Sequence, residues 1–175
     1  VRFCEALLPA LRPDLFVRWV HVLLIDLVGL ASRSPHISGF VKLLRAVLDV
    51  CARCDYFESG SAGAVSDHSR ERCYTMLRAF LLSLLCRARR LKDELFASAA
   101  GLLLSSPRRF VAEQLAQREA PLVMLLRHAL NLGHAYKPLA HLSVAALEDW
   151  TDHLAGLLQP HLPVVLPALR DYLTV

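Results

Sequence analysis

The stretch from Tyr136 to Trp150, YKPLAHLSVAALEDW, constrains the fold most, because it joins a helix start to a one-sided apolar pattern. Pro138 suits the first turn of a helix, where a missing N–H costs no hydrogen bond, and Lys137 before it is biased toward extended backbone. Apolar residues then recur at intervals of three and four, at Leu139, Leu142, Ala146, Leu147, Trp150 and Leu154. This spacing predicts an amphipathic helix that buries one face against other helices.

The same spacing recurs along the chain, with no convincing alternation of the kind typical of strands. It predicts the end of a helix at 1–11 and further helices at about 14–33, 35–51, 73–88, 93–104, 119–132 and 164–173. Helix pairs recur at roughly 40 residues, as in α-solenoids in which each pair buries its apolar face on the next. We therefore expect an all-α, HEAT-like α-solenoid of about seven to eight helices, truncated at both ends. A closed helical bundle is the alternative.

Residues 1–175 are expected to form a single segment of such an array, and we interpret the chain as a piece of a longer protein, because it lacks an initial Met and a signal-peptide layout. Residues 59–69 are rich in Gly, Ser and Ala and predict a mobile loop. Residues 107–118 are ambiguous between a short helix and a variable connection. Gly133 can end the preceding helix, and Pro167 is placed near the first turn of the last one.

Eight large side chains on the apolar faces are candidates for the core: Trp19, Phe40, Leu44, Phe80, Leu84, Leu103, Leu142 and Trp150. Both tryptophans are interpreted as packing residues, since an aromatic residue on an apolar helix face is more often core than a stacking group for a ligand.

Composition excludes several classes of protein. A hydrophobic content of 55% with 21% charged residues excludes general disorder. The best apolar run, from Val20 to Leu30, is interrupted by His21 and Asp26 and falls short of the ~18 to 20 residues of a membrane span, so no membrane partner is expected. The net charge of +4 is mild, and 17 of the 20 basic residues are Arg. Five scattered cysteines indicate a reducing compartment, the cytosol or nucleus.

Several ungapped blocks resemble the N-terminal helical-repeat region of the phosphatidylinositol 3-kinase-related kinases, in the branch that acts at DNA double-strand ends. They are LFVRW at 15–19, ISGFVKLL at 37–44, YFE at 56–58, KDELFASAAGLLLSSP at 92–107, LNLGHAYKPLAHLSVAALEDW at 130–150 and VLPALRDYLT at 165–174. Their order and approximate spacing are kept over nearly the whole chain from Leu15. Little of the family pattern is found in 59–69 and 108–117.

This resemblance implies a very large nuclear serine/threonine kinase that joins the Ku heterodimer at DNA ends in non-homologous end joining. ATP and Mg²⁺ would be cofactors of that parent and not of this segment, whose partners would be neighbouring repeats of the same chain, with Ku and DNA met through the parent. The chain itself has no Gly-rich phosphate loop, HRD-type catalytic loop or DFG-type metal ligand. We therefore expect a non-catalytic scaffold without a small-molecule substrate; an unrelated helical-repeat adaptor is the alternative.

The basic cluster Arg87, Arg89, Arg90 and Lys92 is the one candidate for direct contact with DNA phosphates. Its ordinary interpretation is a solvated helix end, because cations there match the negative end of the helix dipole. The cluster is also small and lacks interleaved aromatic residues. Phosphate contact is therefore the less favoured of the two hypotheses.

A zinc site can be drawn from Cys51, Cys54, His68 and Cys73, but there is one CxxC pair, and Cys51 and Cys73 lie on apolar faces where cysteine serves as a small hydrophobe. We therefore expect no metal. The other histidines show no metal-binding or catalytic grouping, and no Ser-Gln or Thr-Gln pair marks a target of the implied kinase.

Overall fold

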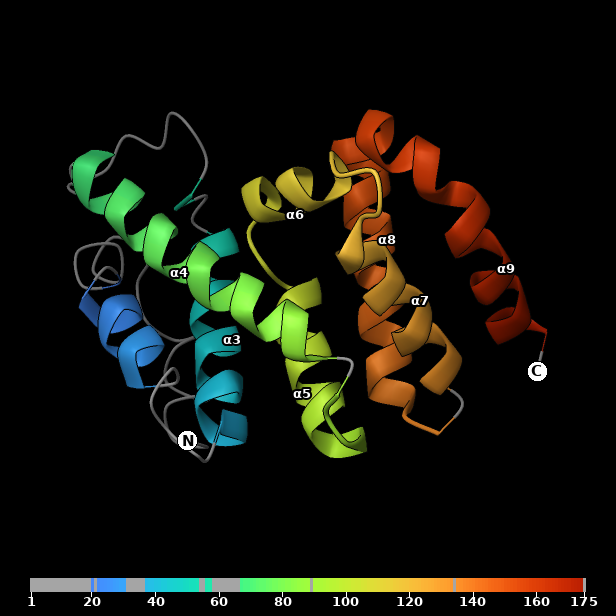
Figure 1. Ribbon diagram of the computed structural model, residues 1–175, viewed down its shortest axis with the longest axis horizontal. Coiled ribbons are helices and arrows are strands. Elements are labelled where there is room, and N and C mark those ends of the chain that lie inside the picture. Colours follow the sequence, from blue (N-terminus) through green and yellow to red (C-terminus); the bar gives the residue numbers. More distant parts are fainter. Residues whose placement is uncertain are drawn as a thin grey trace. The chain divides into compact units, whose positions relative to one another are not determined.

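The computed structural model describes residues 20, 22–30, 37–53, 56–57, 67–88, 90–133 and 135–174. Its labelled elements are α3 (Ile37–Arg53), α4 (Asp67–Ala88), α5 (Asp93–Leu104), α6 (Arg108–Leu115), α7 (Pro121–Leu132), α8 (Lys137–Leu158), the short 3₁₀ helix η2 (Gln159–His161) and α9 (Leu162–Leu173) (Figure 1). Within the described ranges the regular structure is entirely helical, so the predicted all-α fold is confirmed. Trp19 and Arg89 fall outside these ranges.

The chain divides into two compact units, Val1–Leu84 and Leu85–Val175. In the first unit, α3 buries the residues that the three-and-four spacing selects: Val41, Leu44, Val47, Leu48 and Cys51. The Tyr56 backbone N–H donates to the Cys51 carbonyl at 2.9 Å just after α3, and the Phe57 ring lies 6.1 Å from the Tyr74 ring of α4. The aromatic pair after α3 therefore packs toward α4.

The first turn of α4 corrects one predicted boundary. Residues 67–69, assigned to the mobile loop 59–69, are helical, whereas the rest of that predicted loop lies outside the described residues. Asp67 in the first turn of the helix explains the earlier start, because a carboxylate is favourable at the positive end of the helix dipole.

In the second unit, α8 packs against α5, α6 and α7, and α7 packs against α9 as well (Figure 1). Proline occupies the first turn of α8 as predicted, but the helix already begins at Lys137, which was expected to be extended; Tyr136 is the N-cap residue, with φ −127° and ψ 75°. Leu139, Ser143, Ala146 and Trp150 lie on the buried face of this helix. Trp150 is only 1% exposed, so it sits at the centre of this unit.

Most of the candidate core side chains are buried in the structure: Leu44, Phe80, Leu84, Leu103 and Trp150. Two are only half-buried. Phe40 lies beside the buried row that begins at Val41, and Leu142 lies beside the row that runs through Ser143. Ser143 takes the central position because it is small and its hydroxyl donates to the Leu139 carbonyl at 2.8 Å, which satisfies its polar group inside the helix.

The ambiguous stretch 107–118 contains an ordered helix, α6. Pro107 precedes it with an extended backbone, φ −54° and ψ 142°, and Phe110, Val111, Gln114 and Leu115 are buried. The eight-residue length explains the weak signal, since it allows only two turns of apolar repeat. Of the two possibilities, the structure shows the short helix.

Gly133 ends α7 as predicted, but for a different reason. Its backbone is right-handed, with φ −60° and ψ −25°, so the left-handed conformation that favours glycine at helix ends is not used. Instead, a Cβ atom at this position would lie 2.6 Å from the Ala140 Cβ and 3.3 Å from the Tyr172 ring. The missing side chain lets α8 and α9 approach the end of α7.

The last helix starts earlier than predicted. α9 begins at Leu162, so Pro163 takes the first-turn position and Pro167 lies inside the helix. The placement of Pro167 near the first turn was therefore wrong, because η2 continues the helical path up to Leu162.

Across the described residues, no helix is long and apolar enough to cross a membrane.

Candidate nucleic-acid interface

The basic turn, defined here as Arg87–Lys92, connects α4 to α5. Arg87 lies in the last turn of α4, and Lys92 is the N-cap residue of α5 with φ −76° and ψ 160°. Within the turn, the Arg90 N–H donates to the Arg87 carbonyl at 2.9 Å, and the Leu91 N–H donates to the Ala88 carbonyl at 3.1 Å. These bonds satisfy two of the carbonyls left over at the end of α4 and give the turn a defined path.

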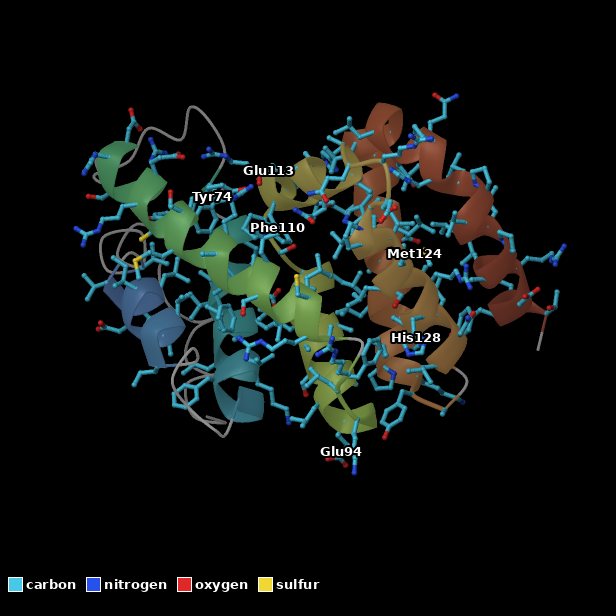
Figure 2. All side chains as sticks on the ribbon, viewed as in Figure 1. Tyr74, Glu94, Phe110, Glu113, Met124 and His128 are labelled. Atoms are coloured by element: carbon cyan, nitrogen blue, oxygen red, sulfur yellow. The ribbon has the colours of Figure 1, made fainter. Side chains whose placement is uncertain are left out.

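The cations of the basic turn point to solvent. Arg87, Arg90 and Lys92 are all exposed, and the predicted fourth member, Arg89, is outside the described residues. The turn also meets an opposing charge, since Glu94 in the first turn of α5 is exposed and points away from the helices (Figure 2). Three described cations therefore lie within six residues, and the acidic residues Asp93 and Glu94 follow them in the first turn of α5.

The exposed cations of the basic turn are compatible with contact to phosphates, but their geometry does not require it. Exposed Arg and Lys side chains can neutralise phosphates and release counterions, and Arg can bind a phosphate through two N–H groups. Arg87, in the last turn of α4, also stabilises that end of the helix through its dipole, whereas Lys92 lies at the N-terminal end of α5, where a cation is not favoured. Arg can also bind the edge of a guanine base, so exposed arginines do not by themselves distinguish phosphate contact from base contact.

A charged contact that the sequence analysis missed joins α6 to α8. The Arg108 guanidinium donates to Asp149 Oδ1 from Nη2 at 2.9 Å and from Nε at 3.2 Å. His153 Nδ1 lies 3.2 Å from the same oxygen. Asp149 and His153 are four residues apart on α8, a spacing visible in the sequence, whereas Arg108 lies 41 residues away and leaves no local signal.

The hypothetical zinc set is not assembled in the described part of the chain. Cys51 and Cys73 are buried thiols that form no disulfide, and His68 is exposed at the start of α4. No three His, Cys, Asp or Glu side chains of the described ranges are grouped to hold a metal ion. Cys54 lies outside those ranges.

The two buried thiols instead lie near the buried phenol of Tyr56. Tyr56 is 2% exposed, and burial raises the pKa of its phenol above the ordinary range, an effect to which the thiols of Cys73 and Cys51 add. Burial likewise raises the pKa of the Cys73 thiol. Both shifts keep the groups neutral, which disfavours the thiolate form that metal binding and nucleophilic chemistry require.

The described residues form an all-helical segment in which helices pack on one another, with an exposed basic turn between α4 and α5. The chain belongs to the DNA-PKcs, N-terminal family, whose pattern matches residues 1–175. It is similar to the DNA-dependent protein kinase catalytic subunits of Gallus gallus and Mus musculus, at 32% identity over 178 residues in each case, and of Xenopus laevis, at 31% over 179 residues. Each of these alignments covers 99% of this chain and 4% of the relative.

Proposed function

We propose that this chain is a non-catalytic, HEAT-like scaffold segment of a DNA-dependent serine/threonine kinase that acts in double-strand break repair by non-homologous end joining. In this role it helps to form the helical cradle around DNA ends and the Ku heterodimer, in the nucleus. ATP and Mg²⁺ serve the parent kinase at a site outside this segment. The observation that carries the proposal is the family match over the whole chain.

The small share of each relative's length that this chain matches supports a structural role. The chain spans about 4% of the length of the kinase subunits that it resembles, and the matching family is described as N-terminal. A segment of this size contributes to a large kinase through its shape and its contacts with neighbouring repeats. Membership of this family argues against the alternative of an unrelated helical-repeat adaptor.

The packing of the second unit supports the same role. α8 contacts α5, α6 and α7, and its large apolar residues are buried in those contacts. The Arg108–Asp149 ion pair fixes α6 on α8 through two hydrogen bonds to one carboxylate oxygen. The side chains of this pair are each 39% exposed, so the pair orients helices more than it stabilises them.

We also propose a test of the less favoured assignment of the basic turn, direct contact with DNA phosphates. The test compares the complete kinase with a variant in which Arg87, Arg89, Arg90 and Lys92 are all replaced by Gln. Since each lost phosphate contact lowers the slope of log K against log salt by about 0.9, the variant should bind DNA with a visibly shallower salt dependence.

A matched control replaces four other arginines by Gln: Arg109, Arg118, Arg127 and Arg170, all of them exposed. It removes the same formal charge from the chain and leaves the basic turn intact. The assignment predicts a normal salt slope for this control. Equal slopes for the wild type and the basic-turn variant would contradict phosphate contact at Arg87–Lys92, while leaving the scaffold role to be tested by stability and activation.

A further inference from the structure

The C-terminal part of α8 departs from regular helix. Leu154 has φ −130° and ψ 24°, outside the helical region, although helical residues continue on both sides of it. Ala155, Gly156 and Leu157 after it are exposed, and a Cβ atom at Gly156 would meet nothing within 4 Å. No proline lies between Leu139 and Leu158 to cause this break. The chain thus bends at a point with open space around it.

The buried side chain of Leu158 and one hydrogen bond hold the segment that follows this bend. His161, at the end of η2, is 9% exposed, and its Nε2 lies 2.8 Å from the carbonyl oxygen of Leu115. A carbonyl can only accept, so Nε2 carries the hydrogen and donates it. Leu115 is the last residue of α6, where carbonyls have no partner within the helix. The His161–Leu115 bond therefore anchors η2 on α6.

Beyond this bond, α9 buries little of its own side-chain surface. Its buried residues are Val165 and Ala168, whereas Leu166 is 52% and Leu173 70% exposed. It packs along α7, and a Cβ atom added at Gly133 would lie 3.3 Å from the Tyr172 ring. Elements with few buried apolar side chains open at lower free energy than the core around them.

We propose that Leu154–His161 is a hinge, and that η2 and α9 open together as one unit when the His161–Leu115 bond breaks. The bend absorbs the rotation at Leu154 and Gly156, where no packed side chain resists it. Opening changes the direction in which α9 presents Leu166 and Leu173, and uncovers the end of α7 at Gly133. The hinge is thus a place where the angle between α9 and the helices before it can adjust, and it does not depend on the proposed function.

Hydrogen exchange measured on the complete chain tests this inference. His161→Ala removes the anchoring bond and leaves a buried carbonyl without a partner, so exchange in peptides from 159–173 should accelerate about tenfold. Exchange in α5 and α7 should stay unchanged, because the opening is local. His153→Ala is the matched control, since it removes an exposed histidine from α8 and should leave 159–173 as in the wild type.

Gly156→Ala provides the second variant. It adds no contact, since the space around Gly156 is open, and it strengthens the helix at the bend. Exchange in 159–173 should therefore slow about fivefold. Unchanged exchange in this variant would overturn the hinge, and so would a His161→Ala variant that leaves 159–173 unaffected or accelerates α5 and α7 equally. If His161→Ala fails to fold, the Gly156→Ala result decides.

Discussion

Helices α7 and α9 look alike in the sequence and differ in the structure. Each is 12 residues long, has a proline in its first turn, and contains eight residues of the hydrophobic type. α7 buries six of its side chains, Leu122, Val123, Leu125, Leu126, Ala129 and Leu130, whereas α9 buries only Val165 and Ala168. The difference lies in their neighbours, because α7 packs against α5, α6, α8 and α9, while α9 packs against α7 and η2.

This contrast shows what apolar content alone can predict. Apolar residues at helical spacing indicate that a helix has a face to bury, but they do not indicate how many other helices cover that face. In α9, Leu166 and Leu173 are exposed, and the helix packs on α7 through Val165, Ala168 and the approach of Tyr172 to Gly133.

The largest effect is expected at the centre of the second unit. Trp150→Ala removes a side chain that is 1% exposed and leaves a large cavity, so the free energy of unfolding should fall by about 3 to 5 kcal/mol. Trp150→Phe, which keeps most of the volume, should lose clearly less. Chemical denaturation monitored by circular dichroism measures both, and a loss below about 1 kcal/mol for Trp150→Ala would show that the ring is not a core residue.

The comparison of α7 and α9 can be tested with one substitution in each. Leu126→Ala, at a position with 0% exposure, should lower the free energy of unfolding by about 2 to 5 kcal/mol. Leu166→Ala, on the exposed side of α9, should change it by less than about 0.5 kcal/mol. Similar losses at the two sites would mean that α9 is covered by a partner in solution, and that the contrast between the helices does not hold.

Gly133→Ala tests the close approach that joins α7, α8 and α9. The added methyl group would lie 2.6 Å from the Ala140 Cβ, so the helices must move apart, and a loss of about 1 to 3 kcal/mol is expected. Gly156→Ala is the control with open space, and should be neutral or stabilising by up to about 1 kcal/mol. Thermal melting of both variants distinguishes them; equal effects would argue against a packing role for Gly133.

The smallest effect is expected for the ion pair between α6 and α8. A double-mutant cycle with Arg108→Ala and Asp149→Ala should give a coupling free energy below about 1 kcal/mol, because both side chains are partly exposed. The coupling should shrink further in 1 M salt. A coupling of several kcal/mol would mean that the pair is better shielded from water than its exposure indicates.

The helices and much of their buried faces could be predicted from the sequence, because that information is local. On α4, Cys73, Leu77, Phe80, Leu81 and Leu84 are buried at the spacing that predicted them. Pro138 likewise predicted the start of α8 from its fixed backbone angle, to within one residue. These features depend on residues three or four apart, or on neighbours in the chain.

Features that depend on distant residues could not be predicted. Arg108 and Asp149 are 41 residues apart, and His161 and Leu115 are 46 apart, so neither contact leaves a pattern in any local window. The bend at Leu154 also lacks a proline that would have marked it. Gly133 was recognised as a helix end, but the atoms that require a glycine there come from α8 and α9.

The central claim is that this segment shapes the kinase and takes no part in its chemistry. The most direct test measures peptide phosphorylation by the complete protein with and without DNA ends, for wild type, Trp150→Ala and Trp150→Phe. We expect Trp150→Ala to keep the kinase activity measured without DNA. Its stimulation by DNA ends should be lower than that of the wild type by a factor of about five or more, and Trp150→Phe should keep most of the stimulation. Normal stimulation in a destabilised Trp150→Ala protein, or an equal loss of activity without DNA, would contradict it.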